Sequence, residues 1–226
     1  MWVVGSVSHQ ISRGDPLSGR RAGGSDFVAG RVRGGGVPSR HLLDENRSVR
    51  HPSSMTAYAD LTEQQAATAL EQFLQERSPA MRRLELAVGD AVELDHSVES
   101  LGPLWAWTKD RLRLGPSGQQ PSWSRLGLGE HERLDEASLQ LLDGLISYVI
   151  DIVTSAVPEA KWEVATDPHP RYLDQNKPML RAGAWEQVPA STIGNLGRQV
   201  FSDWPPADDR LASIVGFWLT DVADTR

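Results

Sequence analysis

One segment constrains the fold of this chain more than any other. Residues 136–157 read EASLQLLDGLISYVIDIVTSAV, with apolar side chains around most of a helical cylinder. Asp135 precedes the segment as an N-cap and Pro158 follows it as a terminator. Because a helix that is apolar on most sides is buried on most sides, we predict a central core helix.

A narrow polar line interrupts that apolar surface. Asp143, Ser147 and Asp151 are spaced by four residues and therefore share one edge of the helix. The two carboxylates are separated by about 12 Å of axial rise, too far to share a proton or to act as a retaining glycosidase pair. The line either meets water or faces a ligand, and we favour a polar edge of a core helix.

Further helices are predicted on both sides of this segment. A helix over 62–77 begins with a capping box, in which Thr62 caps and Gln65 lies three residues later. Pro79 ends it, and a second short helix over 79–88 ends at Gly89. A moderate helix signal covers 191–201, and a clear one covers 207–223.

The strand signals are short. Residues 91–95 (AVELD) predict a strand, as do 161–166 (KWEVAT) and 178–183 (PMLRAG), and the last two are expected to pair. After the first strand, Ser97 is the expected N-cap of a helix with Glu99 in its first turn and Trp105 facing inward. Residues 115–133 predict a long surface loop. The fold class is therefore α+β, a helix-dominated single domain with a small β-sheet.

The first 54 residues differ from the rest. They hold nine of the twenty glycines and show no helical or strand periodicity, so we predict a disordered Gly/Arg-rich tail. An alternative is that translation starts at Met55, which leads directly into the first capped helix. In both cases the globular domain is expected over 55–226.

Charge and composition limit the kinds of partner that this protein is expected to bind. The net charge is -7, divided between a tail with eight arginines and four acids and a body with 15 basic and 26 acidic residues. An acidic body argues against nucleic acid as a partner. No apolar run reaches the length of a membrane span, so no membrane association is expected. The absence of cysteine excludes disulfides and fits a cytoplasmic protein.

No catalytic or cofactor motif is assembled in the sequence. The glycine-rich stretches GRVRGGG and IGNLGRQ lack a preceding strand, and the first also lacks the lysine and hydroxyl of a phosphate loop. The six histidines show no ligand spacing, and no nucleophile elbow is present. We therefore expect no metal site, no cofactor and, on balance, no enzyme.

Eight tryptophans are a high number for this length. Trp105, Trp162 and Trp218 fall on apolar faces and are assigned to the core. The others in the body fall off these faces or in loops, where they predict a recognition patch for a protein: Trp107, Trp123, Trp185 and Trp204.

The stretches LDHSVESLGPL, ISYVIDIV, AKWEVA and NKPML resemble an uncharacterised group of bacterial proteins common in actinobacteria, a family of unknown function. That group has an L-D-x-S-x-E-S-L helix entry, matched from Leu94 to Leu101, then a helix with a tyrosine and an acid, matched by Tyr148 and Asp151, and then a strand opened by a tryptophan, matched by Trp162. Ile150 stands where that pattern has a glycine. The resemblance covers about residues 90–182 and implies a bacterial cytoplasmic domain without implying an activity.

Two functions follow as expectations. The first is a non-catalytic protein-interaction module of the immunity or accessory type, whose acidic face suits a partner with a basic surface and whose patch includes Trp107 and Trp185. The second is a small-molecule-binding protein or an enzyme with a pocket beside the helix 136–157. That pocket would be lined by Tyr148, Asp151 and Trp162. The sequence leaves the oligomeric state open.

Overall fold

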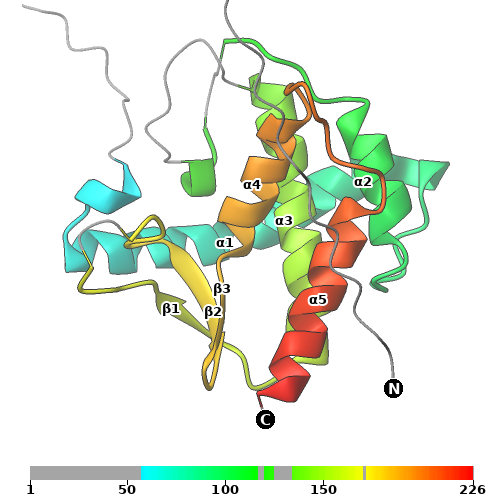
Figure 1. The fold of residues 1–226 in the computed structure, drawn as a ribbon. Helices are drawn as coiled ribbons and strands as arrows, with labels where there is room; N and C mark the ends of the chain where they lie inside the picture. Colours follow the sequence, from blue (N-terminus) through cyan, green and yellow to red (C-terminus); the bar gives the residue numbers. More distant parts are fainter. Residues whose placement is uncertain (1–56, 117–119, 125–133, 170–171, 226) are drawn as a thin grey trace, which may run out of the picture. The chain divides into compact units, whose positions relative to one another are not determined.

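The computed structural model describes residues 57–116, 120–124, 134–169 and 172–225. The predicted tail over 1–54, the alternative start at Met55 and most of the predicted loop over 115–133 lie outside these residues. The described part confirms an α+β fold in which helices dominate (Figure 1). Its main elements are α1 (Glu63–Val88), α2 (Leu101–Lys109), α3 (Glu136–Ala156), β1 (Lys161–Val164), β2 (Pro178–Ala182), β3 (Trp185–Gln187), α4 (Pro189–Gln199) and α5 (Arg210–Asp224).

Helix α1 confirms the predicted capping box and corrects the predicted end. The Thr62 side chain accepts a hydrogen bond from Gln65 N, and Gln65 Oε1 accepts one from Thr62 N. The helix then continues through Pro79 to Val88, so the two predicted helices over 62–77 and 79–88 are one. Its second half buries Ala80, Met81 and Leu84, and this packing offsets the cost of a proline inside a helix.

Helix α3 is the central helix, as predicted. Asp135 caps it by accepting a hydrogen bond from Ser138 N, and its middle is buried on nearly all sides. Among the described helices it is the one that is long and apolar enough to cross a membrane by length and composition. However, 72% of that apolar window is buried inside the fold, which identifies a core helix.

Helices α1 and α3 make the most extensive contact between two described elements, and Gly144 lies at its closest point. A Cβ atom on Gly144 would lie 2.6 Å from Leu84 Cβ and 3.0 Å from the carbonyl oxygen of Ala80. Neither atom is the end of a flexible side chain, so only a separation of the two helices could make room.

We expect Gly144→Ala to lower the free energy of unfolding by about 1–3 kcal/mol, as is usual for overpacking. Gly216→Ala on α5 is the control, because a Cβ atom there has nothing within 4 Å and alanine favours a helix. Urea denaturation followed by circular dichroism measures both. A Gly144→Ala protein as stable as Gly216→Ala would contradict close packing at this point.

The sheet has three antiparallel strands in the order β1-β2-β3. The predicted pairing of the first two is confirmed, with Trp162 opposite Leu180. The third strand was not predicted. It follows a two-residue turn in which Gly183 has φ 63°, a left-handed conformation that glycine adopts without strain, and it places Trp185 opposite Ala182.

The predicted strand over 91–95 is wrong. Residues 89–91 form a short 3-10 helix; Val92 is extended, and residues 92–95 have no strand partner among the described residues. Ser97 is also not the N-cap of α2, since it lies one turn earlier and its hydroxyl accepts a hydrogen bond from Ser100 N. Glu99 therefore precedes the helix. Trp105 does face inward, as predicted, and is fully buried.

Candidate functional site

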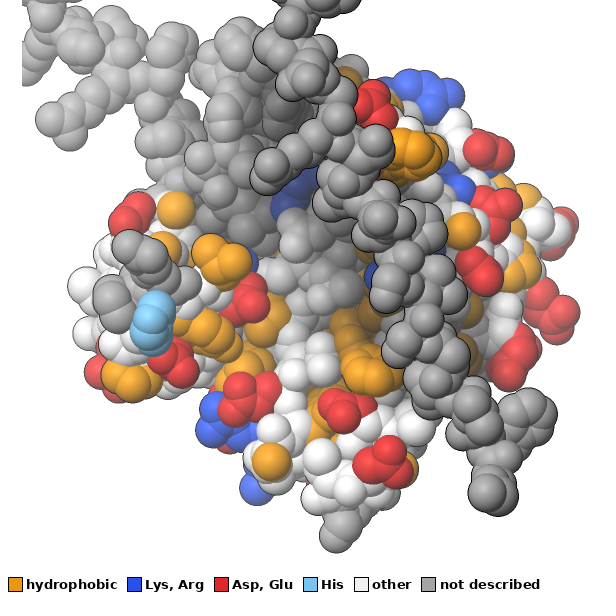
Figure 2. All heavy atoms as spheres, in the orientation of Figure 1, with side chains coloured by type: hydrophobic (Ala, Val, Ile, Leu, Met, Phe, Trp, Pro, Cys, Tyr) orange, Lys and Arg blue, Asp and Glu red, His pale blue; other side chains and the backbone are white. Residues whose placement is uncertain are grey.

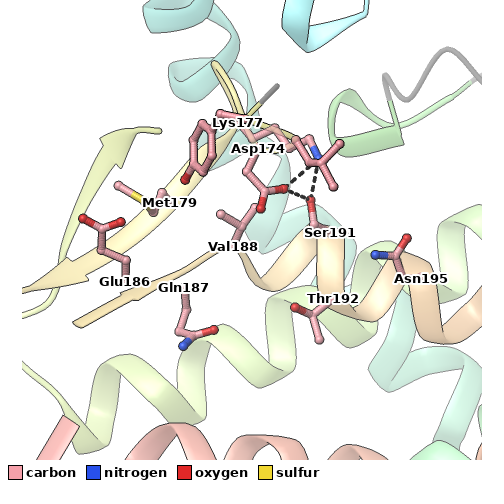
Figure 3. Close-up of a pocket in the computed structure, with 11 residues that line it drawn as sticks. Asp174, Lys177, Met179, Glu186, Gln187, Val188, Ser191, Thr192 and Asn195 are labelled. Carbon is pink, nitrogen blue, oxygen red and sulfur yellow. Dashed lines mark hydrogen bonds and ion pairs between the residues drawn. The ribbon is translucent and has the colours of Figure 1, made fainter. Parts of the chain in front are cut away.

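A cleft opens between the hairpin β2–β3 and the first half of α4 (Figure 3). Its volume is about 450 Å³. We call it the Lys177 cleft. Its lining comes from the turn before β2, from both strands of the hairpin and from α4: Tyr172, Leu173, Asp174, Lys177, Met179, Glu186, Gln187, Val188, Ser191, Thr192 and Asn195.

Three polar side chains in this cleft form a closed network (Figure 3). The Lys177 ammonium group donates to Asp174 Oδ1 at 2.8 Å and to Ser191 Oγ at 2.9 Å. The Ser191 hydroxyl in turn donates to Asp174 Oδ1 at 2.9 Å. Each of the three side chains thus contacts the other two, which fixes all of them in one arrangement.

The chain geometry around the network is rigid. Asn176 adopts a left-handed backbone with φ 65°, and its buried amide donates to the carbonyl oxygens of Tyr58 and Leu61. This anchors the turn that carries Asp174 and Lys177. Pro189 begins α4, where its fixed φ and missing N–H suit the first helical position, and it places the next turn of α4 beside the lysine.

The network leaves hydrogen-bonding capacity that no described residue uses. A lysine ammonium group has three N–H donors, of which described residues use two, and Asp174 Oδ2 accepts no hydrogen bond from a described residue. The side chains of Gln187 and Thr192 also line the cleft and make no hydrogen bond to other described residues. Glu186, by contrast, is paired with Arg181 at 2.7 Å.

The rim of the cleft is partly apolar. Leu173 is 87% exposed beside it, and Met179 and Val188 are buried in its wall. Partial burial raises the pKa of the Tyr172 hydroxyl above its usual range, and the nearby carboxylates of Asp174 and Glu186 raise it further. The site therefore combines a charged floor, neutral hydrogen-bonding walls and an apolar edge.

Chemically, this arrangement is suited to orienting a molecule and not to activating a nucleophile. Lys177 is engaged as an ammonium ion, since it donates to a carboxylate and to a hydroxyl at once. The Ser191 hydroxyl is directed to Asp174, a weak base, and accepts its own hydrogen bond from a cation. Such groups recognise charge and hydrogen-bonding pattern in a ligand.

The residues predicted from the sequence lie elsewhere. Tyr148 is fully buried in the core. Its hydroxyl accepts a hydrogen bond from His96 N at 2.8 Å and forms another with Ser100 Oγ at 2.7 Å. It therefore ties the segment before α2 to the central helix. We expect Tyr148→Phe to lower the free energy of unfolding by about 1–2 kcal/mol, because the hydrogen bonds of the buried hydroxyl to His96 N and to Ser100 Oγ are lost.

Thermal denaturation is the measurement for Tyr148→Phe. The control is Tyr172→Phe, at a partly exposed hydroxyl without a hydrogen bond to other described residues. Equal melting temperatures for the two variants would show that the buried hydroxyl adds nothing to stability.

Asp151 and Trp162 do lie together, through Arg77 of α1. The guanidinium group of Arg77 makes an ion pair with Asp151 and lies 5.8 Å from the centre of the Trp162 ring. Trp162 also meets Phe73 edge-on, with ring centres 5.4 Å apart. The polar line on α3 thus faces two arginines of α1, since Arg83 pairs with Asp143 at 2.9 Å.

The tryptophans assigned to a surface patch are dispersed. Trp123 and Trp185 are buried, at 3% and 2% exposure, and α4 packs against the Trp123 ring at Gly194. Trp107 is half-buried, and the guanidinium carbon of Arg111 lies 4.0 Å from the centre of its ring. Trp204 is 88% exposed. Trp105 and Trp218 are in the core as predicted.

The Lys177 network was not predicted from the sequence, because Asp174, Lys177 and Ser191 do not form a recognisable motif. Lys177 stands just before a strand, and Ser191 stands in the first turn of a helix. The unpredicted strand β3 between them is what turns the chain back and brings the two together. No family model, no curated protein and no solved structure matches this chain.

Proposed function

We propose that this protein is a non-catalytic binding protein for a small zwitterionic molecule, of the size and chemistry of an amino acid, in the Lys177 cleft. The observation that carries the proposal is the closed network of Asp174, Lys177 and Ser191 at the floor of a cleft of about 450 Å³. This network presents one ammonium donor and one carboxylate oxygen that no described residue uses.

The cleft offers complementary groups for each part of such a ligand. A ligand carboxylate pairs with Lys177, and a ligand ammonium group pairs with Asp174. The amide of Gln187 and the hydroxyl of Thr192 supply neutral hydrogen bonds, while Met179 provides an apolar wall for a side chain. Because the site is already ordered, little conformational entropy is lost on binding.

Isothermal titration with a panel of free amino acids tests this proposal. We expect saturable binding of at least one of them, and a loss of about tenfold or more in affinity for Lys177→Met. Lys109→Met is the matched control, since Lys109 also pairs with an aspartate, Asp208, but lies outside the cleft. Lack of binding by the folded wild-type protein, or equal affinity of both variants, would contradict the proposal.

A second function, a protein-interaction module in a bacterial cytoplasm, is supported by a different surface. Trp204, 88% exposed, and Phe201, 40% exposed, lie close in sequence between α4 and α5. Acidic side chains outnumber basic ones on the face drawn in Figure 2, around the edge that holds α2. An exposed tryptophan on an acidic protein suits a protein partner with a basic surface.

Affinity capture with the full chain, at low and high salt, tests this second function. We expect one stoichiometric partner whose retention falls as salt rises and is lost with Trp204→Ala. Leu86→Ala is the control, because Leu86 is equally exposed, at 85%, but lies on α1. A partner retained equally by both variants would exclude Trp204 as its anchor.

A further inference from the structure

The hairpin side of the Lys177 cleft is built by a small apolar cluster that is separate from the main core. Ala165, Met179 and Val188 are buried together, and Tyr172 packs against them. Three of these residues, Tyr172, Met179 and Val188, line the cleft, and we call them the hairpin wall. The fold thus forms an apolar surface in the cleft that its central core does not need.

The alternation of side chains along β2 produces this arrangement. Leu180 belongs to the main core cluster, so Met179 and Arg181 on either side of it point to the opposite face of the sheet. On that face Arg181 pairs with Glu186 of β3 at 2.7 Å and with Glu163 of β1 at 3.3 Å. Met179 therefore lies beside charged side chains that are engaged with one another.

The charge that β3 contributes to the cleft is thus already paired. Glu186 lines the cleft, and its carboxylate is engaged by Arg181. A cationic ligand side chain on the hairpin wall would have to compete with Arg181, and an anionic one would face the negative charge of Glu186. Either charge would also lose part of its hydration against Met179 and Val188, which costs free energy unless the charge is paired. An apolar ligand side chain meets none of these costs.

The two sides of the polar network on the floor of the cleft differ in chemistry (Figure 3). Met179 and Val188 lie on the hairpin side. The hydroxyl of Thr192 and the amide of Asn195 make the α4 side polar. A molecule whose charged groups contact the network therefore meets the hairpin wall on one side only, and this determines the direction in which an apolar part of it extends.

We propose that the ligand of the Lys177 cleft is an amino acid with an unbranched apolar side chain, which packs on the hairpin wall. This inference rests on the proposed function and names the class of amino acid. The charged groups of the ligand meet Lys177 and Asp174, and its side chain extends over Met179 and Val188 beside the Tyr172 ring. A methionine side chain fills irregular gaps and an aromatic ring offers a large contact area, so both suit such a chain.

Isothermal titration of the full chain with alanine, norleucine, lysine and glutamate tests this inference. All four carry the same α-carboxylate and α-ammonium groups and differ only in the side chain. We expect norleucine to bind at least about tenfold more tightly than alanine, because three more carbon atoms are removed from water. Lysine adds a terminal ammonium group to the same chain, and glutamate carries a carboxylate. We expect each of them to bind at least about tenfold more weakly than norleucine.

Variants separate the hairpin wall from the polar network. We expect Met179→Ala to lower the affinity for norleucine about tenfold and to leave that for alanine within about twofold, so the ratio of the two affinities falls. Asp174→Asn is expected to lower both affinities by a similar factor, because both ligands present the same ammonium group. Met81→Ala is the matched control, since Met81 is also buried, at 9% exposure, but lies on α1 outside the cleft.

Circular dichroism confirms that each variant is folded, and the ligand series on the wild-type protein decides the inference if Met179→Ala is not. Equal affinities for alanine and norleucine, or tighter binding of lysine or glutamate than of norleucine, would overturn this inference and leave the proposed function standing. The same norleucine-to-alanine ratio in Met179→Ala and Met81→Ala would show that the side chain does not contact the hairpin wall. No saturable binding of any amino acid by the folded wild-type protein would overturn both proposals.

Discussion

Replacing Trp105 by alanine is expected to lower the free energy of unfolding by about 3–5 kcal/mol, the usual range for a buried tryptophan. Trp105 is fully buried on α2, and its indole N–H donates to the carbonyl oxygen of Ala207 at 3.1 Å. Truncation leaves a cavity between α2 and α5 and deprives that carbonyl of its donor. Because a domain of this kind is stable by about 5–15 kcal/mol, the loss is a large fraction of the total.

Urea denaturation followed by circular dichroism measures this effect, and two further variants separate its parts. Trp105→Phe keeps an aromatic ring but removes the N–H donor and part of the indole, so its loss of stability is an upper limit for the hydrogen bond. Trp204→Ala is the surface control, because Trp204 is 88% exposed, and we expect a change within about 0.5 kcal/mol. Similar losses for Trp105→Ala and Trp204→Ala would mean that Trp105 is not a core residue.

The second large effect is a pH dependence of stability that originates at Asp143. Its pKa is raised to about 7 in the folded protein, chiefly by burial. A raised carboxyl pKa means that the fold favours the protonated form, so its contribution is fully present below about pH 4 and is lost as the pH rises through about 7. We expect this group alone to lower the free energy of unfolding by about 2–3 kcal/mol between pH 5 and pH 8.

Asp143→Asn removes this titration, so the variant is expected to lose that part of the pH dependence and to be at least as stable as the wild-type protein at about pH 8. Chemical denaturation at intervals from pH 5 to pH 8 measures the difference. Asp151→Asn removes the other ion pair between α1 and α3 but keeps Asp143, so it is expected to retain the wild-type slope. An unchanged slope in Asp143→Asn would contradict a titrating, buried Asp143.

The features that were predicted correctly depend on neighbours in the sequence. The capping box at Thr62 and the cap at Asp135 require only residues within one helical turn. The apolar surface of 136–157 required burial whatever covered it. Strands 161–166 and 178–183 were recognisable because their composition and the intervening turn signals are local as well.

The predictions that are wrong depended on what lies across the fold. Residues 91–95 have a strand-like pattern, but an extended segment becomes a strand only where another backbone pairs with it. Pro79 was expected to end a helix, yet the burial of Ala80 and Leu84 against α3 continues it. Ser97 was predicted to cap α2, but the helix begins one turn later and Ser100 is at the N-cap position.

The polar groups of α3 and of the Lys177 cleft also divide into features that were predicted from the sequence and features that were not. The sequence placed Asp143 on a polar line of the core helix, and it left open whether water or a ligand faces that line. In the structure, Asp143 pairs with Arg83 and lies within electrostatic range of Glu76. Both residues are more than fifty positions away along the chain. Lys177 and Ser191 were not singled out at all, because lysine before a strand and serine in a helix are ordinary.

By itself, then, the sequence determined the fold class, the central helix, most helix ends and two of the three strands, because periodicity, capping and turn formation act over a few residues. Only the tertiary structure decided which polar groups meet. Asp174 and Lys177 reach Ser191 through the hairpin, and Asp143 meets Arg83 through the contact of α1 with α3. The charge, burial and pKa of a site are properties of such long-range contacts, which no local pattern records.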